Sequence, residues 1–140
     1  MFEKILVAHD GSDGAQKAFD AAVELACQLK TGLHMISVEA GLPRYAETMV
    51  EIDEEKEAED SYFGQLAAQS RRRAAVHNVS LQTTILAGHE VKSIVDFVAE
   101  GGFDLLVVGF HGHSRIYEHL WGGTSHNITR MAHCSVLVVK

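Results

Sequence analysis

The sequence predicts an α/β fold in which helices cover both faces of a parallel β-sheet. Short apolar runs alternate with segments of helical periodicity, and parallel neighbouring strands require such helical connections. The strands read as continuous apolar runs, which is typical of strands buried on both faces. A length of 140 residues, with 46% hydrophobic and 22% charged residues, indicates one domain over residues 1–140 and excludes extensive disorder.

The first strand and the first helix carry the clearest signals. Residues 4–9 (KILVAH) form an apolar run that ends at the turn-prone segment DGSDG. From Ala15 onward, apolar residues recur at helical spacing. Ser12 or Asp13 can cap the start of this helix, and Gly32 is its expected stop.

The other elements continue the alternation to the end of the sequence. The expected helices span about 44–76 and 90–100, and a final helix begins near Thr124. Further strands are expected at residues 33–39, 80–87, 103–109 and 136–139.

Charge narrows the classes of partner. The net charge is −7, and residues 51–60 hold seven acids against one lysine. We interpret this segment as a solvated helix face or loop, with an acidic docking surface as the alternative. Nucleic-acid binding needs clustered cations, and the one basic run is Arg71–Arg73. Three consecutive helical residues point in different directions, so we expect this run to balance the neighbouring acids rather than to bind phosphate. We therefore expect no nucleic-acid partner.

Targeting signals and cysteines indicate the compartment. No apolar run approaches the roughly 20 residues that span a bilayer, and no signal segment opens the sequence. We therefore expect a cytoplasmic protein with no membrane contact. Cys27 and Cys134 are too few for a disulfide framework, so reduced, buried thiols are expected, with a single bridge left open.

The glycine-rich segment after the fourth strand is the main candidate site. Ligands of parallel α/β sheets bind at the carboxyl ends of the strands. Gly109 and Gly112 follow this strand, and the pair Gly122–Gly123 precedes Thr124 and Ser125 at the start of the last helix. Glycine lets backbone amides approach an oxyanion, and a helix N-terminus adds partial positive charge. The segment predicts a phosphate site, and an ordinary loop with a helix cap is the alternative.

The spacing of these glycines resembles a family signature. Gly109-x2-Gly112-x9-Gly122 is similar to the Gly-x2-Gly-x9-Gly-(Ser/Thr) motif of the universal stress protein family. The segments ILVAHDGS, FDLLVVGFHG and AHCSVLVVK are similar to that family as well, so the resemblance spans the chain. It implies an adenine nucleotide alpha hydrolase-like sheet of five parallel strands in the order 3-2-1-4-5, usually in a dimer. It also implies a site for ATP, with or without Mg²⁺.

The resemblance assigns roles by position. It implies that Asp10 lies beside the ribose and that Ala8 and His9 line the same side. It also implies that Val38 contacts adenine through its backbone. Capping of the first helix stays open as another role for Asp10. The positions implied to surround the phosphates are Val108, Gly109, His111, Gly112, Gly122, Gly123, Thr124 and Ser125.

One position departs from the family pattern. Gly123 stands directly after Gly122, where the motif has Ser or Thr, so a phosphate-binding hydroxyl is missing. Thr124 or Ser125 can substitute by a shift of one residue. We therefore expect ATP binding weakened by roughly 1 kcal/mol.

Other functions remain as alternatives. Because no Walker lysine follows the glycines and no Gly-x-Gly-x-x-Gly follows the first strand, we expect at most slow ATP hydrolysis and no catalytic residue. Four histidines are crowded into one segment: His111, His113, His119 and His126. They favour a metal or pH sensor as a second alternative, although we expect no metal site.

The last strand suggests a protein interface. The run 136–139 (VLVV) would leave an apolar edge exposed in a monomer, and proteins usually cover or pair such edges. We therefore expect a homodimer through Val136 to Val139. A dimeric module that binds an unknown protein partner and no nucleotide is the third alternative, which Gly123 favours.

Overall fold

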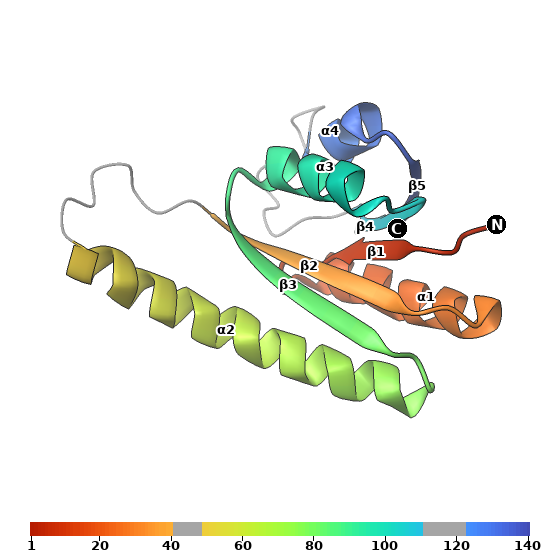
Figure 1. The fold of residues 1–140 in the computed structure, drawn as a ribbon, viewed down its shortest axis with the longest axis horizontal. Coiled ribbons are helices and arrows are strands. Elements are labelled where there is room, and N and C mark those ends of the chain that lie inside the picture. Colours follow the sequence, from red (N-terminus) through yellow and green to blue (C-terminus); the bar gives the residue numbers. More distant parts are fainter. Residues whose placement is uncertain (41–48, 111–122) are drawn as a thin grey trace.

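Strands and helices alternate through the computed structural model, which describes residues 1–40, 49–110 and 123–140 (Figure 1). The strands are β1 (Ile5–Ala8), β2 (Leu33–Ala40), β3 (Leu81–Gly88), β4 (Leu105–Gly109) and β5 (Ser135–Val139). The helices are α1 (Asp13–Leu29), α2 (Met49–Val76), α3 (Glu90–Gly101) and α4 (Thr124–Met131).

The sheet confirms the predicted architecture. Its five strands are ordered β3-β2-β1-β4-β5, and every neighbouring pair is parallel. In the central strand, Ile5 pairs with Leu33 of β2 on one side and with Leu105 of β4 on the other. From β1 the chain adds β2 and β3 on one side of the sheet and then β4 and β5 on the other side. The direction of strand addition changes between β1 and β4, so a topological switch point lies there.

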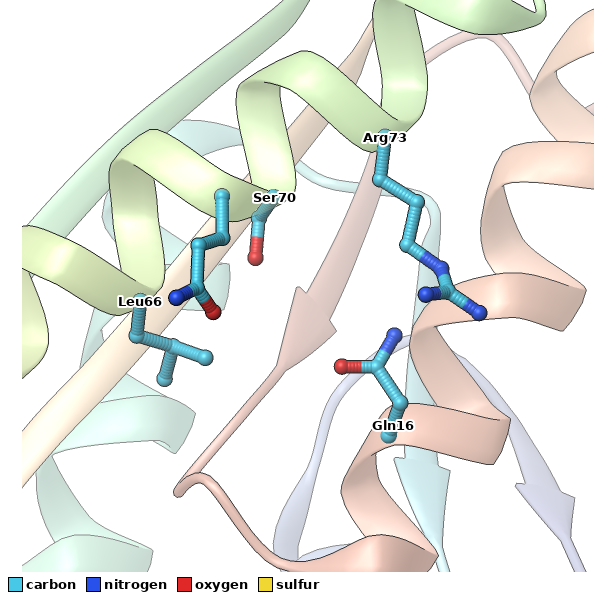
Figure 2. A pocket seen from close by; sticks show the side chains of 5 residues that line it. Gln16, Leu66, Ser70 and Arg73 are labelled. Atoms are coloured by element: carbon cyan, nitrogen blue, oxygen red, sulfur yellow. The ribbon is translucent and has the colours of Figure 1, made fainter.

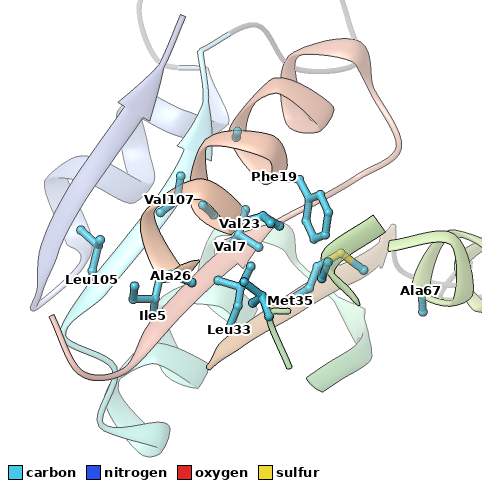
Figure 3. Close-up of a cluster of buried hydrophobic side chains, with 14 residues drawn as sticks. Ile5, Val7, Phe19, Val23, Ala26, Leu33, Met35, Ala67, Leu105 and Val107 are labelled. Atoms are coloured by element: carbon cyan, nitrogen blue, oxygen red, sulfur yellow. The ribbon is translucent and has the colours of Figure 1, made fainter. Parts of the chain in front are cut away.

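Two helices cover each face of the sheet. Alternate side chains of a strand point to opposite faces, so Ile5 and Val7 pack with Phe19 of α1, whereas Leu6 packs with Ile94 of α3. Figure 3 shows the first cluster, which includes Ala67 of α2. The second cluster holds buried residues of α3 and of α4. This arrangement explains why the strands read as continuous apolar runs.

The first helix begins as predicted and ends earlier. Ser12 is its N-cap, and the Ala15 amide donates to the Ser12 hydroxyl at 3.1 Å. The predicted stop at Gly32 is wrong: Lys30, with φ 55°, takes the left-handed position that ends the helix. The Thr31 amide then donates to the Ala26 carbonyl at 3.0 Å, which closes the helix without a glycine.

Some other boundaries also move. The fourth strand starts at Leu105 rather than at residue 103, because the amide of Asp104 turns to the carbonyl of Lys4 at 3.0 Å while Phe103 packs into the core. The second strand extends to Ala40 and the third to Gly88. The expected start of the long helix near residue 44 lies outside the described residues.

The cysteines differ from the expectation of buried thiols. Cys27 is exposed on α1, Cys134 is half-buried, and neither forms a disulfide. The expectation for Cys27 was wrong because its position lies on the solvent side of the helix, beside the buried Ala26. Across the described residues, none of the helices has the length and apolar character needed to cross a membrane.

Candidate functional site

The ends of β1 and β4 and the start of α4 come together at the switch point of the sheet. A Cβ atom on Gly109, at the end of β4, would lie 2.7 Å from the Gly14 carbonyl at the start of α1, so only glycine fits there. The next residue, Phe110, receives a hydrogen bond of 3.5 Å from the Ser125 hydroxyl in the first turn of α4. These contacts gather the first and fourth strand ends around one region, as the sequence predicts.

The loop after β1 holds a turn at Asp10. The Ser12 amide donates to Asp10 Oδ1 at 2.9 Å, which fixes the carboxylate beside the start of α1. The capping role itself belongs to Ser12, so the alternative in which Asp10 caps the helix is wrong. Asp10 places a half-buried carboxylate at the carboxyl end of β1, and carboxylates accept hydrogen bonds from hydroxyl groups.

His9 is buried, and its ring lies within the protein. Its Nδ1 accepts the Gly11 amide at 3.0 Å, which places the ring proton on Nε2, and Nε2 donates to Gln16 Oε1 at 3.1 Å. The Ser37 hydroxyl donates to the His9 carbonyl at 2.8 Å. Burial lowers the pKa of His9, against smaller opposing effects of Gln16 and two nearby acids. The neutral ring therefore braces the loop.

A chain of hydrogen bonds connects this loop to α2. Beyond His9 and Gln16, the Gln16 amide nitrogen donates to Asp20 Oδ1 at 3.1 Å. Arg73 of α2 then pairs with Asp20 through Nε at 2.6 Å and Nη2 at 2.9 Å. The position of the loop that carries Asp10 is therefore linked to the packing of α2 against α1.

Tyr62 lies beside the same loop, and the sequence analysis did not identify it as part of the site. Its hydroxyl occupies the place where a Cβ atom of Gly11 would stand, although the residue is 54% exposed. Gly11 has φ 91°, a backbone conformation that L side chains rarely adopt. Aromatic residues in a helix are commonly core residues, so no local signal distinguishes Tyr62.

The start of α4 forms the other side of the site. Gly123 is the N-cap, and within the described part of the chain no side chain caps the helix. The first-turn residues are Thr124 and Ser125, both half-buried, and amides at a helix start favour anions. Val108, which precedes the last residue of β4, is 3% exposed.

Of the remaining predicted site residues, the structure describes Val38 but not the glycine-rich segment after β4. Val38 is half-buried on β2, two residues beyond the Ile36 carbonyl that accepts the His9 amide at 2.9 Å. His111, Gly112 and Gly122 lie outside the described residues. His113 and His119 lie outside them too, and the described residues contain no group of three or more metal-ligating side chains.

A second acid was also missed at this edge of the sheet. Glu39 follows Val38 on β2 and is 1% exposed. Carboxylates are rarely so deeply buried, and Glu39 lies at the carboxyl end of β2, the edge of the sheet at which the candidate site is found. The only local signal is a glutamate within an apolar strand.

The comparisons with known proteins agree with one family. A model of the universal stress protein family matches residues 1–140. The universal stress protein YxiE of Bacillus subtilis is 32% identical over 148 residues, with 100% of both proteins covered. The solved universal stress protein UspA from Lactobacillus plantarum has a TM-score of 0.90 at 26% identity, and the match covers 99% of this chain and 98% of that one.

A second similar structure was solved with a bound ligand. It is a universal stress protein in complex with cAMP, with a TM-score of 0.78 at 24% identity, and the match covers 99% of this chain and 97% of that one. At this identity the likeness supports the fold, which is adenine nucleotide alpha hydrolase-like. With its match to the family model over residues 1–140, and with a relative 32% identical over its full length, this chain belongs to the universal stress protein family.

Proposed function

We propose that the protein binds an adenine nucleotide as a regulatory ligand at the switch point of its sheet. The observation that carries this proposal is the N-terminus of α4, which no described side chain caps and which contacts the end of β4, the strand next to β1 and its carboxylate-bearing loop. A phosphate needs amide donors, and a ribose needs an acceptor. The cAMP complex of a family member supports the same class of ligand.

In the proposed complex, the two sides of the site have different tasks. Asp10 accepts hydrogen bonds from the ribose hydroxyls, and the backbone at Val38 contacts adenine. Ala8 and the backbone of His9 line that side. The phosphates lie against amides at the end of β4 and at the start of α4: Val108, Gly109, His111, Gly112, Gly122, Gly123, Thr124 and Ser125.

The proposed ligand is ATP, with or without Mg²⁺, and the proposed role is binding, with at most slow hydrolysis. The site uses backbone amides and hydroxyls, whereas efficient phosphoryl transfer requires positioned metal ions and cations. Gly123 removes one hydroxyl of the family motif, so we expect reduced affinity for ATP. We place this binding in the cytoplasm, in a homodimer.

A second candidate is a dimeric, partner-binding module without a nucleotide. Gly123 at the N-cap position favours it, because Gly123 offers no side chain to a phosphate. Exposed apolar side chains on β5, at the end of α4 and after β4 also favour a protein interface: Leu137, Met131 and Phe110.

Calorimetric titration of ATP and AMP into the wild type and into Asp10→Asn separates the two candidates. We expect ATP to bind to the wild type and about tenfold more weakly to Asp10→Asn, which keeps an acceptor for the Ser12 amide and loses the charge. The matched control is Asp13→Asn, an exposed acid in the first turn of α1, which should leave affinity unchanged. Absence of heat with either nucleotide would favour the partner-binding module.

A further inference from the structure

The ring of His9 holds the β1–α1 loop, residues 9–12, in the conformation that presents Asp10. Before Asp10, the His9 amide donates to the Ile36 carbonyl of β2 at 2.9 Å. After it, the Gly11 amide donates to Nδ1 of the His9 ring at 3.0 Å, and the Ser12 amide donates to the Asp10 carboxylate at 2.9 Å. The backbone is therefore fixed on both sides of the carboxylate.

Only the neutral His9 ring can hold Gly11. A proton on Nδ1 turns this atom from an acceptor into a donor, and it would then face a second donor, the Gly11 amide. His9 is 2% exposed, so the charged ring would also be desolvated. The conflict is relieved when the Gly11 peptide moves away from the ring, and Asp10 moves with it. Protonation therefore favours a loop conformation other than the one that presents Asp10.

The surroundings of the ring favour its neutral form. Burial is the largest effect and lowers the pKa of His9, whereas the hydrogen bond to Gln16 and the charges of Asp10 and Asp20 oppose it. Asp20 is itself neutralised by its ion pair with Arg73. The ionisable groups on the elements around the loop are Asp10 beside the ring, Asp20 on α1, Glu39 on β2, and Tyr62 and Arg73 on α2.

We propose that nucleotide binding is coupled to the protonation of His9, so that the protein binds ATP more weakly as the pH falls. This inference rests on the proposed function, in which Asp10 accepts hydrogen bonds from the ribose. The ligand needs Asp10 in place and the neutral ring keeps it there, so ATP and the proton compete. The affinity is highest where the ring is neutral and falls as the pH drops below 6.5.

The phosphates of ATP act in the opposite direction, because negative charge attracts a proton to a nearby histidine. In the proposed complex the phosphates lie toward α4, whereas His9 lies on the ribose side. Charge effects weaken with distance and with screening, and the hydrogen bond to Gly11 is direct. We therefore expect bound ATP to lower the pKa of His9. Attraction by the phosphates alone would raise it, so the sign of the shift separates the two mechanisms.

The first test is an NMR titration of the histidine rings of the full chain, with and without saturating ATP. We expect His9 to titrate about half a pH unit lower with ATP bound, which corresponds to about threefold weaker ATP binding by the protonated protein. The exposed His77 is the internal control and should titrate alike in both samples. A His9 ring that titrates at the same or a higher pH with ATP bound would overturn the proposal.

Gln16 allows the coupling to be moved in both directions, because its Oε1 accepts from Nε2 of His9 at 3.1 Å. The residue borders a cavity of about 260 Å³ between α1 and α2, so a side chain of similar shape fits there (Figure 2). The cavity is lined by Gln16, Leu66, Gln69, Ser70 and Arg73.

Two substitutions of Gln16 should shift the loss of ATP affinity along the pH scale. A carboxylate in Gln16→Glu stabilises the protonated His9 ring, so the affinity should fall at a higher pH than in the wild type. Gln16→Met removes the acceptor, so the affinity should fall at a lower pH. Gln28→Glu adds the same charge at an exposed position of α1 and should follow the wild type. Identical pH profiles in all four proteins would contradict the coupling.

Calorimetry at pH 7.5 and 5.5 completes the test with His9→Asn. Asparagine accepts the Gly11 amide at either pH, so the ratio of the two ATP affinities should be smaller than in the wild type. Titration of the phosphates contributes equally to both proteins and cancels. An equal ratio in both proteins would reject the coupling and leave the proposed function intact. Absence of ATP binding at either pH would remove the proposed function and this inference together.

Discussion

The hydroxyl of Tyr62 lies where a side chain of Gly11 would stand, so α2 reaches the loop that follows the first strand. Gly11 is thus constrained twice, by this neighbour and by its own φ of 91°. Tyr62 is more than half exposed and its hydroxyl is the far end of a movable side chain, so it can shift. The backbone conformation is therefore the stronger constraint.

We expect Gly11→Ala to lower the free energy of unfolding by about 1–2 kcal/mol, because alanine is disfavoured at a positive φ. Removing the tyrosine ring with Tyr62→Ala should recover little of that loss. Urea denaturation measures both effects. Gly64→Ala, on α2 with open space around its Cβ position, is the matched control and should be neutral or stabilising. Full recovery in the double variant would mean that the contact with Tyr62 dominates.

The regular elements were predictable because their signals are local. The apolar run of β1, the hydroxyl of Ser12 at the helix start and the periodicity of α3 all act within a few residues of chain. Strand order was expected from the family resemblance and is confirmed, whereas periodicity alone does not determine it. Gly32 and Lys30 show the limit of such signals. Glycine favours a helix stop, but the helix ends earlier, at Lys30, where hydrogen bonds to the Ala26 carbonyl close its last turn.

The site was predictable only in part, because much of it depends on packing between distant segments. Gly109 was identified from its motif, and its close approach to Gly14 gives the physical reason. The position of Tyr62, the burial of Glu39 and the cavity beside Ser70 depend on how α2 and β2 lie in space. No spacing of residues in the sequence carries that information.

The buried His9 predicts a dependence of stability on pH. Burial lowers its pKa in the folded protein below the ordinary value of 6.5, with Gln16, Asp10 and Asp20 opposing. The unfolded chain therefore binds a proton more readily than the folded one. The contribution of His9 to stability is complete above pH 6.5 and is lost as the pH falls from 6.5 toward the folded pKa, by about 1.4 kcal/mol per unit of separation.

Urea denaturation of the wild type and of His9→Asn between neutral and mildly acidic pH measures this effect. Asparagine keeps an acceptor for the Gly11 amide, so the variant should fold and show a smaller loss of stability on acidification. Part of the slope should remain, because burial also lowers the pKa of His34. His77→Asn, at an exposed position, should behave as the wild type. Identical slopes in His9→Asn and wild type would contradict the assignment.

Restoring the missing hydroxyl of the family motif should tighten nucleotide binding. A Cβ atom on Gly123 meets nothing within 4 Å, so Gly123→Ser introduces a hydroxyl at the start of α4 without a clash. We expect ATP to bind severalfold more tightly, which corresponds to about 1 kcal/mol. Calorimetry measures the affinity. Ser125→Ala is the opposing control and should weaken it, whereas an unchanged affinity in Gly123→Ser rejects a role for this position.

The free edge of β5 should form the dimer interface. Within the described residues β4 is the only strand paired with β5, and Leu137 on β5 is 40% exposed. A charge there would be desolvated in a dimer, so Leu137→Lys should shift the protein toward monomer. Light scattering at micromolar concentration measures the mass. Val76→Lys, a 79% exposed apolar residue at the end of α2, is the matched control and should stay dimeric. A monomeric wild type would place the interface in doubt, and with it the partner-binding alternative built on a dimer.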